Sequence, residues 1–303
     1  MRIVFMGTPD FAVPSLRELA CTNEVTLVLT RPDAVRGRGR KLVASPVKAA
    51  ALELGLPVVE TKRITSELLA RIRAAQPDAL AVAAFGCILP DELLDMAPLG
   101  CVNVHGSLLP RWRGAAPILR AVLAGDERVG VSIMRIVHEL DAGAYCRQAS
   151  VALTDQTCPQ LMDELARLGA HELAGALSEI AAGTAVWVEQ DPLRVTYAPK
   201  IEKVEMHLDP AARAWENRRR VQASLDEAPA RLSVGGRGLR ALDARVADAS
   251  VAEGRVLVRG GHVYLGCVDG ALELTRVKPD GKREMAASAW ASGLRGAMSW
   301  DTL

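Results

Sequence analysis

Residues 101–117 have the sequence CVNVHGSLLPRWRGAAP, in which a short apolar strand leads into a loop with glycine, proline and charged side chains. Successive side chains of a strand point to opposite faces, so Asn103 and His105 share one face and the valines share the other. Gly106 and Pro110 then end the regular structure. The segment therefore predicts a buried strand that carries a polar pair at its carboxyl end.

The sequence around this segment predicts an α/β fold. Residues 78–86, DALAVAAFG, are apolar after the first aspartate, as expected for a strand that helices cover on both faces of a sheet. Predicted strands at 2–6, 24–30, 57–59, 78–84 and 130–137 alternate with predicted helices at 11–20, 45–54, 66–75, 91–96, 115–124 and 160–182. Because such alternation is typical of βαβ units, we expect a parallel, Rossmann-like sheet.

Asn103 and His105 are the candidate catalytic pair. Open α/β sheets bind their ligands beyond the carboxyl ends of the strands, which is where both side chains are expected. An asparagine amide can donate a hydrogen bond to a developing oxyanion, and a histidine can transfer a proton near neutral pH. The alternative is a hydrogen-bonded structural histidine, but the adjacent asparagine and the rigid loop that follows favour a chemical role.

The loop at 85–90 should lie beside this pair if the predicted strands are neighbours, and a further turn supplies a candidate carboxylate. The loop at 85–90 would place Gly86 where a ligand can approach the backbone and Ile88 where it offers an apolar wall. Asp141 follows the strand at 130–137 and supplies a carboxylate in a tight turn. Ordinary loop packing, and for Asp141 a role in forming the turn, are the structural alternatives.

Composition excludes several classes of protein. The 303 residues suffice for one large or two ordinary domains, and half of them are hydrophobic. None of the six cysteines belongs to a CxxC pair, so we expect no zinc site and reduced thiols in the cytoplasm. The first strand is not followed by GxGxxG, so a dinucleotide cofactor is not supported. No apolar run reaches about 18 residues, and the first apolar stretch is too short for a signal peptide.

The loop Arg31–Lys41 concentrates positive charge. Its eleven residues contain five basic side chains and one acidic side chain, for a net charge of +4 in a chain whose total is +1. The glycines in this loop disfavour a stable helix. A solvated surface loop and a mobile arm that holds phosphates both fit this composition.

The last third of the chain changes pattern. Its short β-rich runs are separated by the dipeptides Gly235-Gly236, Gly260-Gly261, Asp269-Gly270 and Asp280-Gly281. Such dipeptides are typical of tight hairpins, and short strands at regular spacing predict a small β-barrel. The predicted division is an α/β domain at 1–188, a linker at 189–208 and a barrel domain at 209–303.

The chain resembles the methionyl-tRNA formyltransferase family over nearly its whole length. The matching segments are GTPDF at 7–11, GRG at 37–39, SPVK at 45–48, the central segment at 103–117, LDAG at 140–143 and YAPK at 197–200. The SLLP core of the central segment is typical of enzymes that use formyltetrahydrofolate. The basic loop with its SPVK sequence points to the tRNA branch of these enzymes.

The resemblance implies transfer of a formyl group from 10-formyltetrahydrofolate to the amino group of methionine on initiator tRNA. It also implies that Asn103, His105 and Asp141 form the catalytic set. Attack of the amine on the formyl carbon gives a tetrahedral oxyanion, which Asn103 and a protonated His105 can stabilise. Asp141 would position His105 and favour its charged form. No metal ion and no covalent intermediate are required.

The resemblance also implies binding residues and partners. The implied folate-binding residues are Ser107, Leu108, Leu109, Pro110, Gly86 and Ile88. The implied tRNA-binding residues lie in the basic loop and are Arg36, Arg38, Arg40 and Lys41. The barrel, similar to an OB fold, would hold the body of the initiator methionyl-tRNA. We expect a monomer in the cytoplasm, without association with a membrane.

Two other functions fit parts of the sequence. Relatives that formylate a sugar nucleotide, or that hydrolyse formyl folate, share the central segment and Asp141, whereas the basic loop favours tRNA. A non-catalytic tRNA-binding protein, in which Asn103 and His105 would be structural, belongs to a different class. One segment departs from the family, because QASLDEAP stands at 222–229 where members usually carry an Asn-Pro-Trp-Pro-like sequence.

Overall fold

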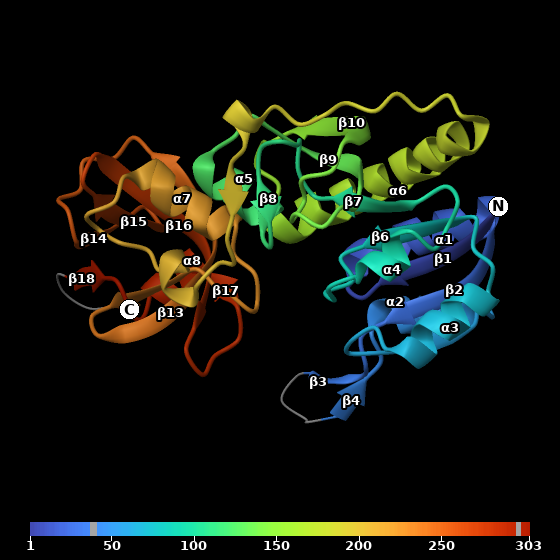
Figure 1. The fold of residues 1–303 in the computed structure, drawn as a ribbon. Coiled ribbons are helices and arrows are strands. Elements are labelled where there is room, and N and C mark those ends of the chain that lie inside the picture. Colours follow the sequence, from blue (N-terminus) through green and yellow to red (C-terminus); the bar gives the residue numbers. More distant parts are fainter. Residues whose placement is uncertain (37–40, 295–297) are drawn as a thin grey trace. The chain divides into compact units, whose positions relative to one another are not determined.

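A seven-stranded sheet organises the first part of the chain in the computed structural model, which describes residues 1–36, 41–294 and 298–303 (Figure 1). Its strand order is β10-β9-β7-β6-β1-β2-β5. The strands are β1 Arg2–Gly7, β2 Glu24–Thr30, β5 Val58–Glu60, β6 Ala79–Ala83, β7 Cys101–His105, β9 Arg128–Arg135 and β10 Tyr145–Ala152. The run from β7 to β5 is parallel throughout, which confirms the predicted α/β sheet.

One edge of this sheet corrects the expectation of parallel strands. β9 runs antiparallel to β7, and β10, a strand that the sequence pattern did not reveal, runs antiparallel to β9. Only residues 136–144 connect β9 to β10, and a parallel pair needs a crossover of about a dozen residues or more. The short connection therefore forces the chain to reverse, and the reversal carries Asp141.

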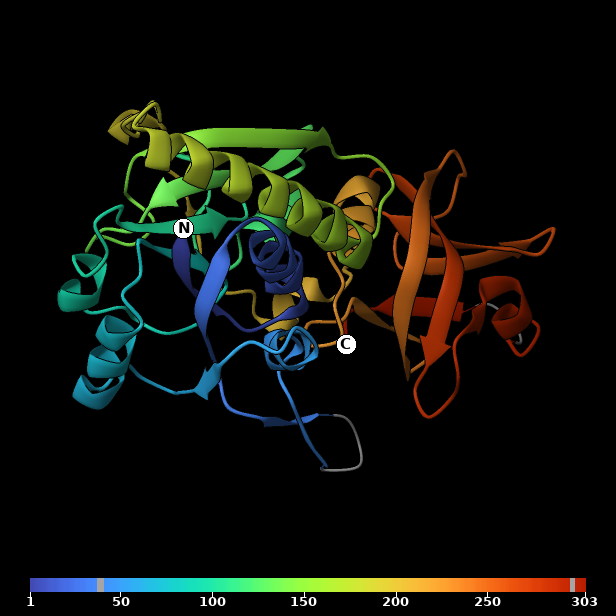
Figure 2. The same ribbon diagram turned by 90° about the vertical axis from the view of Figure 1, so that its right-hand side faces the viewer.

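Helices cover both faces of the sheet. They are α1 Val13–Thr22, α2 Pro46–Glu53, α3 Ser66–Ala74, α4 Asp91–Leu94 and α6 Cys158–Ala182, and α5 Pro117–Ala124 follows the central segment. On one face, Ile72 of α3 and Leu93 of α4 share an apolar cluster with Leu80 of β6. On the other face, Gly169 of α6 lies so close to Val104 of β7 that a side chain there would overlap the valine. Figure 2 shows α6 in front of the strands.

The last third of the chain forms a closed barrel, as predicted. Its strands are β12 Arg231–Val234, β13 Arg237–Ala247, β14 Arg255–Arg259, β15 His262–Cys267, β16 Gly270–Pro279 and β18 Met298–Asp301, with β17 Met285–Ala286 beside β16. A second pairing between β13 and β16 closes the ring. The predicted hairpins at 235–236 and 260–261 each join two neighbouring antiparallel strands, and all four of these glycines have positive φ. The helices here are α7 Ala214–Gln222 and α8 Ala287–Ala291.

The chain divides into two compact units. The first consists of Met1–Ile118, Arg128–Ala152 and Leu161–Pro199. The second consists of Leu119–Glu127, Leu153–Gln160 and Lys200–Leu303. Two short segments of the earlier chain therefore belong to the same unit as the barrel. In the part of the chain that the structure describes, no helix has the length and apolar character needed to span a membrane.

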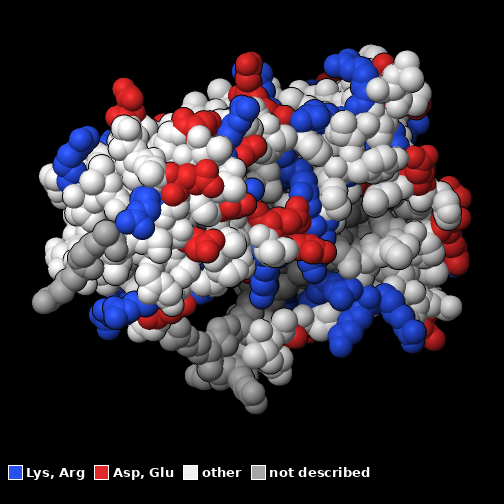
Figure 3. Space-filling model, turned by 90° about the vertical axis from the view of Figure 1, so that its left-hand side faces the viewer, with Lys and Arg blue, Asp and Glu red and all other residues white. Residues whose placement is uncertain are grey.

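Arginines of the barrel pair with nearby carboxylates. The pairs among the described residues include Arg231–Asp280, Arg240–Asp226, Arg245–Glu273 and Arg276–Glu284. Figure 3 shows one face of the molecule, on which basic and acidic side chains are interspersed. The charge of the barrel is therefore neutralised locally at these positions.

One of these carboxylates makes the barrel sensitive to pH. Glu273 is 5% exposed and lies 2.8 Å from Arg245 and 2.6 Å from His262. The hydrogen bond from Arg245, with a smaller contribution from His262, holds the pKa of Glu273 below its usual value. A carboxylate whose pKa is lower in the folded chain than in the unfolded chain stabilises the fold when the pH is above both values. This stabilisation is lost as the pH falls through the pKa of the folded state.

We expect Glu273→Gln to lower the thermal unfolding midpoint near pH 7, and we expect this effect to shrink at acidic pH as the wild-type carboxylate becomes protonated at its lowered pKa. Thermal unfolding followed by circular dichroism over this pH range measures the difference. Glu284→Gln is the matched control, because its ion pair with Arg276 is 3.4 Å long and solvent-exposed. A difference between wild type and Glu273→Gln that stays constant with pH would contradict the role of the carboxylate charge.

Candidate active site

Asn103 and His105 lie at the carboxyl end of β7, which pairs with β6 on one side and β9 on the other. Val104 between them faces α6, so the two polar side chains point to the opposite face of the sheet. Asn103 is partly exposed, and its side-chain amide has no hydrogen-bond partner among the residues that the structure describes. The loop at 85–90 follows β6, the parallel neighbour, and therefore lies at the same edge.

The imidazole of His105 is held from two sides. The ring is 5% exposed, its Nε2 lies 2.8 Å from the carbonyl oxygen of Trp112, and its Nδ1 lies 3.7 Å from Oδ2 of Asp141. A carbonyl oxygen can only accept, so Nε2 carries a hydrogen. Nδ1 is then the position that gains a proton when the ring becomes charged, and the proton would face a carboxylate.

Asp141 stands in the turn between β9 and β10. Its φ of +49° is unusual for a residue with a side chain, and its Oδ2 accepts a hydrogen bond of 2.8 Å from the backbone N–H of Gly114. Gly143 completes the turn, because a Cβ at that position would overlap the carbonyl oxygen of Arg135. The structure thus brings Asp141 to His105, as the sequence predicts.

Two residues that the sequence did not single out hold this turn. Gln190 donates 2.8 Å hydrogen bonds from Nε2 to the carbonyl oxygens of Asp141 and Gly143. Its Oε1 accepts a hydrogen bond of 2.9 Å from Nε of Arg113, which also pairs with Glu139 at 2.9 Å. Gln190 lies within the predicted linker, where no periodic pattern marks a buried side chain.

Ser132 of β9 holds the loop 107–110 in place. Its Oγ donates to the carbonyl oxygen of Ser107 at 2.6 Å and accepts from the N–H of Leu109 at 3.1 Å. The same Oγ accepts from Nε2 of Gln148 at 2.8 Å. A single buried hydroxyl therefore satisfies three polar groups at the start of the predicted folate loop.

The predicted folate residues differ in what they offer a ligand. Ser107 and Leu109 are each 3% exposed, and their backbone groups bind Ser132 and Gln148, so the loop offers a ligand little accessible surface at these positions. Leu108 and Pro110 are partly exposed. Across the edge of the sheet, Gly86 is exposed with φ of +76°, and Ile88 is 93% exposed.

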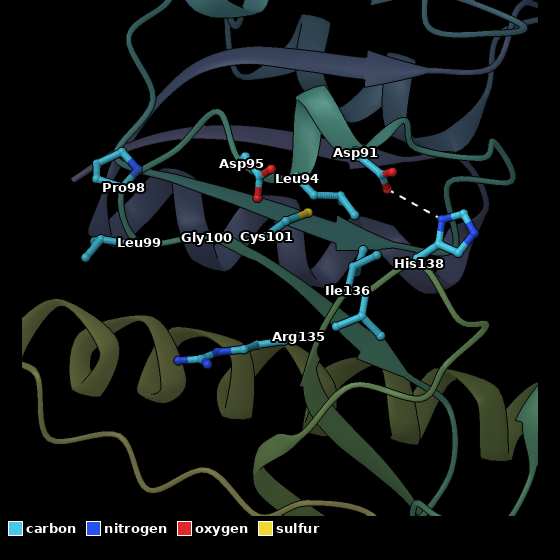
Figure 4. A pocket seen from close by; sticks show the side chains of 11 residues that line it. Asp91, Leu94, Asp95, Pro98, Leu99, Gly100, Cys101, Arg135, Ile136 and His138 are labelled. Carbon is cyan, nitrogen blue, oxygen red and sulfur yellow. Dashed lines mark ion pairs between the residues drawn. The ribbon is translucent and has the colours of Figure 1, made fainter.

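A cavity of about 470 Å³ lies at the amino end of β7, in the first unit (Figure 4). Its lining consists of Asp91, Leu94, Asp95, Pro98, Leu99, Gly100, Cys101, Arg135, Ile136, Val137 and His138. Burial raises the pKa of the Cys101 thiol to about 12, so this part of the wall is uncharged at neutral pH. Cys101 shares its face of β7 with Asn103 and His105.

No local sequence pattern indicates this cavity. Its walls come from α4, from the start of β7 and from the residues after β9, and none of the predicted folate residues lines it. Figure 4 shows Asp91 and His138 at its edge, where Nδ1 of the histidine lies 3.5 Å from the carboxylate. Within the described residues, no group of three or more His, Cys, Asp or Glu side chains could hold a metal ion.

The basic loop has an ordered base. Its flanks form the antiparallel strands β3 Ala34–Arg36 and β4 Lys41–Val43, where the sequence predicts a plain loop. Arg38 and Arg40 lie outside the described residues, as do the side chains of Arg36 and Lys41.

Lys48 of α2 ties this base to the sheet. Its Nζ lies 2.8 Å from both Asp33 and Glu60, and the hydrogen bond to Asp33 is the main reason that the pKa of Lys48 is raised. The same hydrogen bond lowers the pKa of Asp33. Lys48 and Asp33 are therefore charged at neutral pH, and the loop begins at a fixed point.

Comparison with known proteins identifies the family. Residues 1–177 match the family described as "Formyl transferase", and residues 200–295 match "Formyl transferase, C-terminal domain". The methionyl-tRNA formyltransferase of Halorhodospira halophila (strain DSM 244 / SL1) is 45% identical over 300 residues, which are 97% of this chain and 96% of the relative. The chain belongs to the methionyl-tRNA formyltransferase family.

Solved structures share the fold at much lower identity. WlaRD, a sugar 3N-formyl transferase crystallised in the presence of dTDP and 5-N-formyl-THF, has a TM-score of 0.68 and 15% identity, over 93% of this chain and 99% of its own. HypX from Aquifex aeolicus in complex with tetrahydrofolic acid has a TM-score of 0.64 and 17% identity, over 97% of this chain and 47% of its own. These similarities concern the fold alone.

We expect Ser132→Ala to destabilise this methionyl-tRNA formyltransferase family member by about 1–3 kcal/mol, because two buried backbone groups, Ser107 O and Leu109 N–H, lose their shared partner. Denaturant unfolding measures the change. Ser150→Ala on the neighbouring strand is the control. Among the described residues, the Ser150 hydroxyl accepts hydrogen bonds only from the exposed guanidinium of Arg128. Equal destabilisation by both substitutions would contradict the special role of Ser132.

Proposed function

We propose that the chain transfers the formyl group of 10-formyltetrahydrofolate to the amino group of methionine on initiator methionyl-tRNA. One observation supports this function above the others: a buried histidine, a carboxylate and an asparagine without a side-chain partner among the described residues converge at the end of β7. They do so in a chain that belongs to the methionyl-tRNA formyltransferase family.

Asn103, His105 and Asp141 would act on the tetrahedral intermediate. The free amine attacks the formyl carbon, a C–N bond forms, and the carbonyl electrons move to oxygen. Asn103 donates a hydrogen bond to this oxyanion, and a charged His105, with its Nδ1 proton facing Asp141, stabilises it electrostatically. The bond from carbon to N10 of the folate then breaks, N10 takes up a proton, and the attacking nitrogen loses one.

The folate co-substrate would lie along the edge of the sheet and extend into the cavity. Gly86, Ile88, Leu108 and Pro110 offer accessible surface beside Asn103, while the buried Ser107 and Leu109 would give the loop its shape. The cavity beyond Cys101 combines apolar walls with aspartates, which suits a flat ring with amino donors. The related folds of HypX and WlaRD were solved with tetrahydrofolic acid and 5-N-formyl-THF respectively.

The initiator tRNA would contact the basic loop. Arg36, Arg38, Arg40 and Lys41 supply charge for phosphates, and the β3–β4 base exposes 57% of Val35 and 71% of Leu42. A two-stranded hairpin such as β3–β4 is too small to have its own hydrophobic core. It therefore depends on the ion pairs of Lys48 at its base for a fixed position. In this proposal residues 1–188 form the catalytic domain, 189–208 the linker and 209–303 the OB-like tRNA-binding domain of a cytoplasmic monomer.

We expect Asn103→Ala and His105→Ala each to lower kcat by about 100-fold or more, since each removes a group that stabilises the oxyanion. The assay measures formyl transfer from 10-formyltetrahydrofolate to charged initiator tRNA, with a sugar-nucleotide amine as a parallel acceptor. His171→Ala, on the exposed side of α6, is the matched control. Unchanged transfer by His105→Ala would contradict catalysis, and transfer to the sugar alone would replace the proposed acceptor.

We expect the triple variant Arg36→Ala, Arg38→Ala, Arg40→Ala to raise KM for tRNA and to leave folate binding unchanged, because the proposed role of these charges is to bind tRNA phosphates. The salt dependence of tRNA binding should weaken in parallel. A control with the same charge change replaces Arg71, Arg73 and Arg167, which are exposed on α3 and α6. Equal losses of tRNA and folate binding would count against the proposed role of the loop.

A further inference from the structure

The turn that carries Asp141 makes few contacts of its own. Within it, Ala142 N donates to Glu139 O over 3.3 Å, and the side chain of Leu140 is 66% exposed. Asp141 also adopts a left-handed backbone conformation, which a residue with a side chain keeps only when its surroundings enforce it. The position of the carboxylate therefore depends on groups outside the turn.

Gln190 provides the main external support. Its side chain is 9% exposed, and one amide nitrogen donates to the carbonyl oxygens on both sides of Ala142, those of Asp141 and Gly143. The orientation of the amide is unambiguous, because carbonyl oxygens only accept hydrogen bonds and the guanidinium of Arg113 only donates them. Every hydrogen-bonding direction of this amide is thus specified by a neighbour.

Arg113 connects this support to the opposite side of the carboxylate. Its side chain is 7% exposed, and it binds Gln190 through Nε and Glu139 of the same turn through Nη1. The next residue, Gly114, donates its N–H to Oδ2 of Asp141. The backbone of Asp141 is therefore held by Gln190 and its carboxylate by Gly114, with Arg113 joining the two.

We propose that Gln190 is a positioning residue for catalysis, which fixes the carboxylate of Asp141 relative to the imidazole of His105. This inference rests on the catalytic role proposed for Asp141. Without the two hydrogen bonds to the turn, the carboxylate loses its fixed distance from Nδ1, which is 3.7 Å in the structure. The loss affects the chemical step and leaves the contacts to either substrate intact.

The test uses Gln190→Glu, which keeps the shape of the side chain and an oxygen for Arg113. The substitution replaces the NH2 group, which donates to the carbonyl oxygens of Asp141 and Gly143, with a carboxylate oxygen that can only accept, so both hydrogen bonds are lost. We expect kcat for formyl transfer to fall by about 10- to 100-fold, with KM for tRNA and for folate unchanged. Gln222→Glu provides the stability control, because Nε2 of Gln222 also donates to two carbonyl oxygens, at Thr154 and Gln156.

A double-mutant cycle with Asp141→Asn separates the possible outcomes. If Gln190 acts through Asp141, Gln190→Glu causes no further loss of kcat in the Asp141→Asn background. Full activity of Asp141→Asn would overturn the role proposed for Asp141 itself. Loss of kcat in Asp141→Asn with normal kcat in Gln190→Glu would overturn the inference alone. Equal losses of kcat from Gln190→Glu in both backgrounds, accompanied by a lower unfolding temperature, would show a merely structural role.

Discussion

The pairing of β7 between β6 and β9 is the constraint on which the site depends. Its parallel partner β6 brings the loop at 85–90 to the end that carries Asn103 and His105. Its antiparallel partner β9 runs away from that end, so the chain must return through residues 136–144, and the return delivers Asp141. One strand between two neighbours of opposite direction therefore assembles the proposed catalytic set from residues far apart in the sequence.

Charge is used differently in the two parts of the chain. At the base of the basic loop, Lys48 forms ion pairs with Asp33 and Glu60, which anchor the start of the loop. In the barrel, arginines such as Arg245 pair with carboxylates of the same unit. In the described part of the barrel, these pairs leave the charge balanced locally. It also explains why net charge alone says little about the partner.

Much of the fold follows from local patterns. The apolar run at 78–86 and the alternation of strands and helices sufficed for the parallel sheet, and glycine-containing dipeptides marked the hairpins of the barrel. The polar pair Asn103 and His105 was visible because a strand sends alternate side chains to one face. The antiparallel strand β10 was not visible, since its half-exposed residues lack a clear apolar alternation.

By itself, the sequence determined the class of fold, the family and the polar residues at the end of the central strand. Those properties depend on how apolar, polar and glycine residues are spaced along the chain, and this spacing can be read from periodic patterns and short motifs. Only the tertiary structure decided which segments support that site: Gln190 and Arg113 behind Asp141, Ser132 beneath the loop at 107–110, and the cavity beyond Cys101. These depend on hydrogen bonds and packing between segments far apart in the sequence, and no local pattern specifies such partners.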